Sequence, residues 1–374
     1  MKSAGRYLRM MISSMLVMLL FTACSSSSDE ARELPTLDIY IYPPDHAMPT
    51  RSESMASLPV ENEVRSLQIW VYQHDNGNTL GTIELSEDQL ANLNSSLHGE
   101  VYHMEMTEEF AEKKPNVDVY VLANVKTSNC GIEYHSNLSR SSLEDARIDE
   151  NYFCPVVEVP EAGFPMSGVL RNTAVGGKNP VFRITTTQLM RTVSKIRFVF
   201  SSSTLREETL FIDGVKLDAQ MIPKLEYLFL NDENPTYRIS GSYNSEEITL
   251  LGADAVAPVN KSPDPEYYKY KGQANYATII DEAVKDNLLT EAPSVYLRES
   301  DKQLQGTIYY HVGNDRTPRT ARFSMAEVTA DNRFARNHTW IVYGYYSASG
   351  LEVSKVDVTD WEDGGSTDQD VYNW

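Results

Sequence analysis

Cysteine and histidine, the usual ligands of zinc, are scarce in this chain of 374 residues, which holds three cysteines and seven histidines. No His-Glu-x-x-His motif is present, and no histidine stands at a matching spacing from Cys130 or Cys154. His98 and His103 are five residues apart, which puts them on opposite faces of a strand and out of register on a helix. The sequence therefore predicts no metal site.

Few thiols are also left for disulfide formation. After Cys24 only Cys130 and Cys154 remain, and both lie in segments typical of loops. An exported chain meets an oxidising compartment in which two such cysteines can pair. Sequence alone does not show that their Cα atoms lie within bonding range. A disulfide and two separate thiols both stay open.

The motifs that carry common catalytic chemistry are missing as well. Gly176-Gly177-Lys178 resembles the end of a phosphate-binding loop, but Asn172 stands where the first glycine belongs and Asn179 where Ser or Thr is needed. No Gly-x-Ser-x-Gly elbow occurs. With 53 acidic residues, carboxylate pairs occur by chance and identify no glycosidase. We expect no catalytic residue, no cofactor and no enzymatic activity.

Positive charge is in short supply. The chain has 33 Lys and Arg against 53 Asp and Glu, a formal net charge of -20. Residues 1–23 contain three basic and no acidic residues, so their removal changes the charge from -20 to -23. A chain of this charge repels nucleic acid and anionic lipid head groups. A DNA- or RNA-binding role is excluded on this ground.

Long apolar runs are missing except at the N-terminus. Lys2, Arg6 and Arg9 lie around the start of an apolar run over residues 10–21, which is the layout of a secretory signal peptide. The run is shorter than the roughly 20 apolar residues that span a bilayer. Residues 20–24, Leu-Phe-Thr-Ala-Cys, resemble a lipobox, so we expect cleavage after residue 23 and lipidation of Cys24. The alternative is a plain signal peptide with a chance cysteine. Residues 24–35 form an acidic, Ser-rich linker.

The rest of the chain shows mainly the period of two that indicates half-buried β-strands. Asp75-Asn76-Gly77-Asn78 is a strong hairpin signal, because Asn-Gly supplies the positive φ angles of tight turns. Ser86 with Gln89 predicts a capping box and a short helix, and a second helix is expected within 276–289. The alternating segments are 37–42, 67–72, 117–122, 195–200, 340–346 and 353–358. The fold class is therefore all-β with short helical insertions.

The mature length of about 350 residues exceeds what one core supports, so two domains are expected. The turn-rich segment 172–180 is the best boundary, which gives an N-terminal β-sandwich over 36–180 and a C-terminal one over 181–374, the latter with a polar tail. The 22 tyrosines could serve a carbohydrate-binding surface. They fall within strand patterns, however, and tyrosine favours strands in general.

Several segments, taken in order along nearly the whole mature chain, resemble the fimbrillin superfamily of Bacteroidales, the subunits of type V pili. The acidic, Ser-rich residues 25–30 also resemble the export tags of Bacteroidetes surface lipoproteins. The resemblance implies two tandem transthyretin-like β-sandwiches and a lipoprotein precursor at the cell outer membrane. The segments are Cys24, 36–42, 49–52, 64–72, 119–125, 164–168, 189–196, 336–340 and 356–361.

The resemblance also implies a mechanism of assembly. A trypsin-like protease cuts after an arginine, the first strand leaves, and a neighbouring subunit's strand takes its place. The removable strand would carry Leu37, Ile39 and Ile41. Arg51, followed by Ser52, is the expected cleavage site, because a cut at Arg32 would leave the strand attached and prolines 43, 44 and 49 make the surrounding segment an exposed loop. The alternative is an ordinary solvated arginine.

The expected partners are other fimbrial subunits, a lipid anchor in the outer membrane, and a host or bacterial surface ligand for adhesion. Stalk, anchor and tip roles are not separated by the sequence. An anchor or tip subunit would keep its lipid and its first strand. A surface carbohydrate-binding lipoprotein would share the signal peptide, the acidity and the strands, but it has no need of a removable strand.

Overall fold

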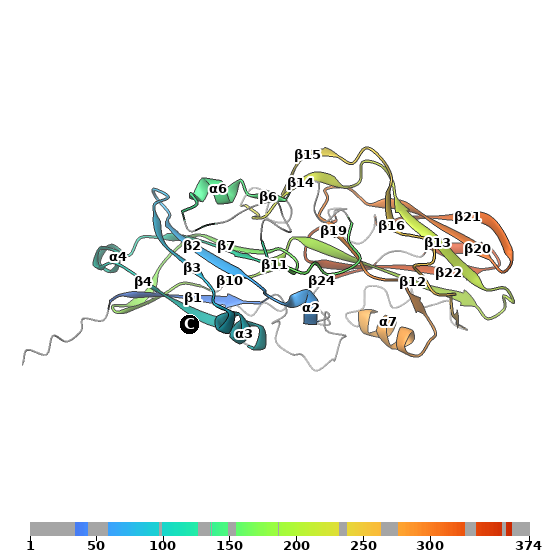
Figure 1. The fold of residues 1–374 in the computed structure, drawn as a ribbon, viewed down its shortest axis with the longest axis horizontal. Coiled ribbons are helices and arrows are strands. Elements are labelled where there is room, and N and C mark those ends of the chain that lie inside the picture. Colours follow the sequence, from blue (N-terminus) through green and yellow to red (C-terminus); the bar gives the residue numbers. More distant parts are fainter. Residues whose placement is uncertain are drawn as a thin grey trace, which may run out of the picture.

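The computed structural model shows two β-sandwiches joined end to end in an elongated molecule (Figure 1). About half of the described residues are in strands, and the all-β sandwich fold expected from the sequence is confirmed. The residues that the structure describes are 34–43, 59–96, 99–125, 135, 137–148, 155–185, 187–231, 238–262, 276–325, 334–353 and 357–360.

The first sandwich packs two sheets around one apolar core. In one sheet β1 pairs with β4 on one side and with β9 and β10 in parallel, and β8 follows β9; the other has the order β11-β7-β5-β2-β3. The elements are β1 (Thr36–Tyr42), α2 (Pro59–Asn62), β2 (Leu67–Gln73), β3 (Thr79–Glu84), α3 (Glu87–Ser95), β4 (Glu100–Glu105), α4 (Glu108–Lys113), β5 (Val117–Ala123), β7 (Met166–Thr173), β8 (Gly176–Lys178), β9 (Val181–Arg183), β10 (Thr187–Gln188) and β11 (Met190–Arg191).

The second sandwich also has two sheets around a core. The longest strand, β12, pairs in parallel with β22, while β13 and β20 form the centre of the facing sheet. The elements are β12 (Val193–Ser203), β13 (Leu210–Leu217), β16 (Ile248–Leu251), β17 (Lys261–Ser262), α7 (Tyr276–Lys285), β18 (Thr290–Glu291), β19 (Val295–Arg298), β20 (Gln305–Val312), β21 (Asp315–Ser324), β22 (His338–Ser347), β23 (Gly350–Val353) and β24 (Asp357–Asp360).

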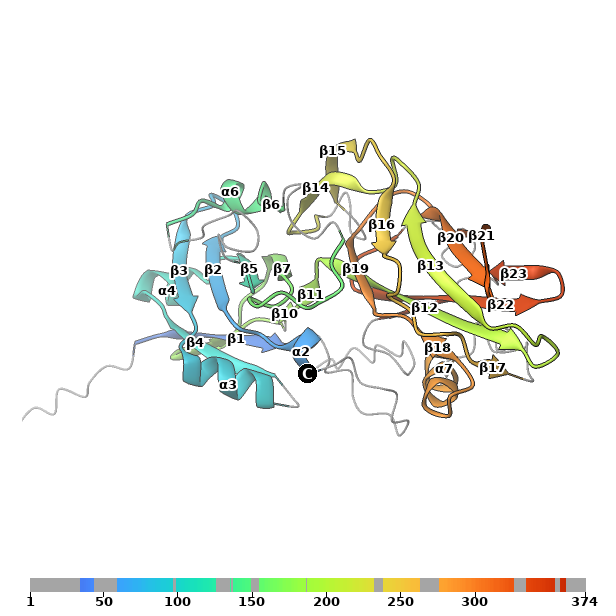
Figure 2. The same ribbon diagram turned by 45° about the vertical axis from the view of Figure 1, so that its right-hand side comes forward.

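A small third sheet connects the two sandwiches (Figure 2). It has the order β15-β14-β6 and consists of β6 (Arg147–Ile148), β14 (Pro223–Tyr227) and β15 (Ile239–Tyr243); a helix, α6 (Arg140–Glu144), precedes β6. Val156 and Tyr296 exchange backbone hydrogen bonds of 3.1 and 2.8 Å. The ring of Phe229 lies 5.0 Å from that of Tyr120 in an edge-to-face contact. Contacts between segments far apart in sequence therefore join the first sandwich to the second.

Strands β9, β10 and β11 follow the turn-rich segment at which the sequence predicts the domain boundary. They nevertheless pair with β1 and β7 of the first sandwich. The sequence pattern did not reveal this, because a fresh strand after a turn indicates only a new element and not its partner. We therefore propose to move the boundary from residue 180 to about residue 192, where β12 begins.

Several local predictions agree with the structure. The turn at 75–78 joins β2 to β3, with Gly77 at φ 68°. The capping box of Ser86 and Gln89 opens α3, and the second predicted helix is α7. Of the strand expected over 353–358, the structure describes residue 353, in β23, and residues 357–358, in β24; both elements pair antiparallel with β22, and residues 354–356 lie outside the described residues.

The predictions that β2 and β5 are half-buried are wrong. Trp70 and Tyr72, on the face opposite Ile69, are as buried as the core residues. They belong to a second apolar cluster with Leu143, Phe164 and residues 228–229, which cover the outer face of this sheet.

In the described residues, no helix is long and apolar enough to cross a membrane.

Candidate functional site

The first strand of the described chain, β1, lies inside its sheet and not at an edge. Its residues 36–41 pair antiparallel with residues 105–100 of β4. On the other side, residues 36–38 pair in parallel with 181–183 of β9, and residues 41–42 with 187–188 of β10. We call the position between β4 and the pair β9 and β10 the β1 slot.

The inward face of β1 completes the core of the first sandwich. Leu37, Ile39 and Ile41 have no exposed surface and belong to one cluster with residues of the facing sheet. Alternation alone predicts this orientation, and the structure agrees with it. Burial of each such side chain contributes about 1.5–3 kcal/mol, so loss of the strand would open a large apolar cleft.

Backbone contacts fix the two ends of β1. The N–H of Thr36 donates to the carbonyl of Pro180 at 2.7 Å, and the N–H of Met106 donates to the carbonyl of Pro35 at 2.7 Å. At the other end Gly99, at φ +70°, lies so close that an added Cβ would be 2.4 Å from the carbonyl oxygen of Ile41. Only glycine fits there without a shift of the strand.

The outward face of β1 carries a buried carboxylate. The side chain of Asp38 is 6% exposed, and its Oδ1 lies 2.7 Å from Nδ1 of His103. Its Oδ2 lies 3.7 Å from Nε of Arg183. His103 and Arg183 are the residues paired with Asp38 on β4 and β9. The acid of β1 is thus held from both sides of the slot.

A buried acid held by a histidine and an arginine also occurs in the facing sheet, although its partners lie just after β2 and in α6. Residues 117–121 of β5, Val-Asp-Val-Tyr-Val, repeat the pattern of residues 37–41, Leu-Asp-Ile-Tyr-Ile. Asp118 lies 2.7 Å from Nδ1 of His74 and 2.6 Å from Nη1 of Arg140, and it accepts the N–H of Asn172 at 2.8 Å. Burial acts to raise the pKa of Asp118, but these hydrogen bonds outweigh burial and hold the pKa below its ordinary value.

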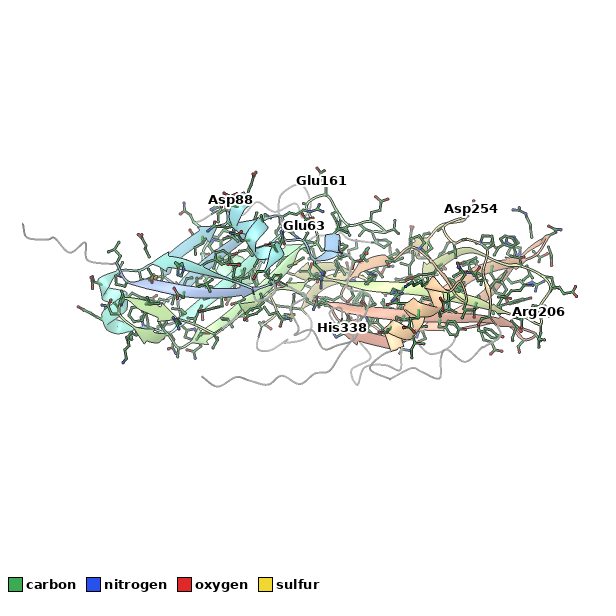
Figure 3. The ribbon with its side chains drawn as sticks, turned by 90° about the horizontal axis from the view of Figure 1, so that it is seen from below. Glu63, Asp88, Glu161, Arg206, Asp254 and His338 are labelled. Atoms are coloured by element: carbon green, nitrogen blue, oxygen red, sulfur yellow. The ribbon has the colours of Figure 1, made fainter. Side chains whose placement is uncertain are left out.

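A third buried acid secures the segment that follows residues 44–58. Glu61, in α2, has no exposed surface and lies 2.9 Å from Nζ of Lys195 on β12. The hydroxyl of Tyr296 donates to the same carboxylate, and Nε of Arg191 donates to the backbone carbonyl of Glu61 at 3.3 Å. Figure 3 labels the neighbouring Glu63 near the middle of the molecule. Helix α2 is therefore attached to the second sandwich as well as to the first.

Of the predicted site residues, the structure describes Leu37, Ile39 and Ile41, and it brings them together in the slot. The predicted lipidation, cleavage and disulfide residues lie outside the described residues; they are Cys24, Arg51, Ser52, Cys130 and Cys154. Sequence reasoning missed the role of Asp38 and the pairing of His103 with it. The available signal was an acid between apolar strand residues, which occurs at both 38 and 118.

No metal site emerges in the described part of the chain, because no three His, Cys, Asp or Glu side chains gather there. The Asp38 pair with His103 and the Asp118 pair with His74 each have an arginine as the third member. A guanidinium cannot act as a metal ligand, and it balances the charge of the carboxylate. These clusters are built to hold an acid inside a sheet.

Comparison with known proteins finds no matching family model and no matching curated protein. Solved structures do match. A candidate cell adhesion protein from Parabacteroides distasonis has a TM-score of 0.54 at 14% identity, over 87% of this chain and 97% of that one. The tip fimbrial protein Mfa3 from Porphyromonas gingivalis has a TM-score of 0.48 at 13% identity, over 87% and 99%. This chain therefore shares its fold with the cell adhesion protein from Parabacteroides distasonis.

Proposed function

We propose that this chain is a structural subunit of a cell-surface fimbria that assembles by strand exchange and supports adhesion. The observation that carries the proposal is the position of β1. It is the first described element of the chain, yet it fills the interior of a sheet and completes a core. Cleavage of the chain between β1 and α2 would separate β1 from the rest of the protein. All the other described elements would stay covalently joined.

Removal of β1 would leave a binding site for the strand of another chain. Strands β4, β9 and β10 would each expose unpaired backbone N–H and C=O groups, and the places of Leu37, Ile39 and Ile41 would form an apolar cleft. Unpaired strand edges are templates for the backbone of another chain, and pockets for alternate side chains give specificity. A strand from a neighbouring subunit would pair with the backbone groups and fill the apolar cleft.

The remaining steps of the proposal concern residues outside the described ranges. The precursor is exported, lipidated at Cys24 and held at the outer membrane, and cleavage between Arg51 and Ser52 frees β1. The partners are other fimbrial subunits and a ligand on a host or bacterial surface. Two sandwiches joined end to end by a shared sheet suit a subunit that carries load along its length (Figure 1).

The test is controlled cleavage of the purified mature protein with a dilute arginine-specific protease. We expect one early product that begins at Ser52, followed by a ladder of oligomers. The variant Arg51→Ala should give neither, whereas Arg32→Ala, a matched arginine upstream of β1, should behave as the wild type. A product that begins at Ser52, keeps its fold and stays monomeric at high concentration would refute assembly.

An anchor subunit is the second candidate. In an anchor, β1 stays in its own slot, which is the arrangement that the structure describes. Such a subunit would keep the lipid on Cys24 and would offer only a donor strand, not an acceptor slot. Resistance of the segment around Arg51 to cleavage on intact cells would favour this role.

A further inference from the structure

The outer rim of the β1 slot carries one arginine and one histidine side chain that face one position of the occupying strand. His103 and Arg183 stand directly opposite position 38 on the two neighbouring strands. Their side chains are 66% and 63% exposed, while the Asp38 carboxylate between them is 6% exposed. The acid is therefore covered by its partners, and the partners remain with the slot when β1 leaves.

Without an acid at that position, Arg183 would lose its counter-ion and His103 its hydrogen-bond partner. In the part of the chain that the structure describes, Asp38 is the acid paired with both of them. A neutral residue there would leave Arg183 without its ion pair, and a basic residue would place a second positive group beside Arg183 at a largely dehydrated position. Removal or reversal of the charge therefore lowers affinity.

We propose that the β1 slot selects its occupant by charge as well as by shape, an inference that rests on the strand-exchange function proposed above. The partner is an extended segment of another subunit that runs in the direction of β1. It carries apolar residues at three alternate positions and a carboxylate between the first and the second. His103 and Arg183 are the specificity-determining residues that bind this carboxylate.

The first sandwich itself shows that such an acid belongs in the middle of a strand. Asp118 occupies the equivalent place in the same residue pattern and is held by His74 and Arg140. The two acids differ in that β1 is proposed to leave the sandwich, whereas β5 stays in it. Strand β5 is a central strand bonded to β2 and β7 within a continuous chain, so Asp118 always keeps its partners. Asp118 therefore keeps the same partners in every state, whereas the acid at position 38 is replaced when the strand is exchanged.

The size of the expected discrimination follows from the exposure of the partners. A hydrogen bond to a charged group is worth more than one between neutral groups, but His103 and Arg183 are more than half exposed and are screened by water and salt. We expect a strand with Asn in place of Asp to bind about tenfold more weakly, or ~1.4 kcal/mol. A strand with Lys should bind at least about a hundredfold more weakly.

The experiment uses the full mature chain with a specific protease site inserted between residues 51 and 52, so that cleavage does not depend on Arg51. After cleavage, fluorescent peptides of residues 34–43 compete for the slot, and anisotropy gives their affinity. The peptides are the wild type, Asp38→Asn, Asp38→Lys and Ile39→Asp. A control peptide, Asp38→Asn with Tyr40→Asp, keeps the net charge but moves the acid by two positions.

The expected order of affinity is wild type, then Asp38→Asn, then Asp38→Lys, with the displaced acid no better than Asp38→Asn. A chain with His103→Ala and Arg183→Ala should bind all of these within about threefold of one another. A chain with His74→Ala, which weakens the permanent pair, should keep the full preference. Circular dichroism shows that each variant is folded.

Two results would overturn different claims. If peptides enter the slot but Asp38→Lys binds as well as the wild type, the charge selection is wrong and strand exchange stands. If Ile39→Asp binds as well as the wild type, or no peptide enters while β1 is released, the slot is not an exchange site and both proposals fail.

Discussion

At the scale of single residues, the first sandwich depends on acids placed inside its strands. Asp118 illustrates the cost of such a placement, since its side chain is 3% exposed and three groups donate to it. A buried carboxylate is tolerated when its partners make up for lost hydration. We expect Asp118→Asn to destabilise the protein by about 1.5–3 kcal/mol at pH 7.

The pH dependence of this variant follows from the lowered pKa of Asp118. The stabilisation is present above the unfolded pKa of about 3.9 and is lost as the pH falls through the lower folded pKa. The difference in free energy of unfolding between wild type and Asp118→Asn should therefore shrink below about pH 4. Urea titrations at several pH values measure it, and a difference independent of pH would contradict the charged state of Asp118.

Glu226 at the domain junction behaves in the opposite sense. Burial raises its pKa well above the ordinary value, the Arg336 guanidinium opposes this, and the Glu299 carboxylate adds to it. Arg336 lies 2.6 Å from Glu299 and 3.2 Å from Glu226, so two acids share one guanidinium. Stability from protonated Glu226 is complete below its unfolded pKa and is lost as the pH rises through the folded one.

Glu226→Gln imitates the protonated carboxyl and should remove this loss. We expect the variant to gain stability relative to the wild type as the pH rises from about 5 to about 8. Glu299→Gln is the matched control, because Glu299 makes the shorter contact with Arg336, and its loss should destabilise the protein. Thermal unfolding across this pH range tests both, and parallel curves for Glu226→Gln and wild type would refute the prediction.

At the scale of elements, β1 is the strand on which the functional account depends. Ile39→Asp would bury a carboxylate without a partner in the core and should cost about 3–5 kcal/mol, or a fall in Tm of roughly 10 °C. Val181→Asp, an apolar-to-acid change at a 37% exposed position of neighbouring β9, is the control and should cost under about 1 kcal/mol. Equal melting temperatures for Ile39→Asp and wild type would mean that β1 is not part of the folded core.

The elements also show what the sequence could and could not predict. Alternation placed Leu37, Ile39 and Ile41 on the core face, since a half-buried strand has a period of two. It failed at Trp70 and Tyr72, because what covers the second face of a sheet comes from residues far away in sequence. The partners of Asp38 and Glu61 were missed for the same reason, as each depends on a long-range register.

At the level of the whole molecule, the proposed function requires export, cleavage and assembly in that order. The first step depends on Cys24, whose sulfur is the expected acylation point. Cys24→Ala should leave the precursor without lipid and absent from the outer membrane, because two or more acyl chains are needed for stable anchoring. Metabolic labelling with a palmitate analogue, with Cys130→Ala as control, measures this. Label retained in Cys24→Ala would refute it.

The N-terminal residue of the protein recovered from the cell surface shows whether β1 is removed so that subunits can join. The sequence offers two informative starts, Cys24 and Ser52, which lie on either side of β1. Mass spectrometry of the surface protein should find a chain that begins at Ser52 and lacks residues 34–43. A chain that begins at lipidated Cys24 and retains β1 within assembled fimbriae would contradict the exchange of this strand.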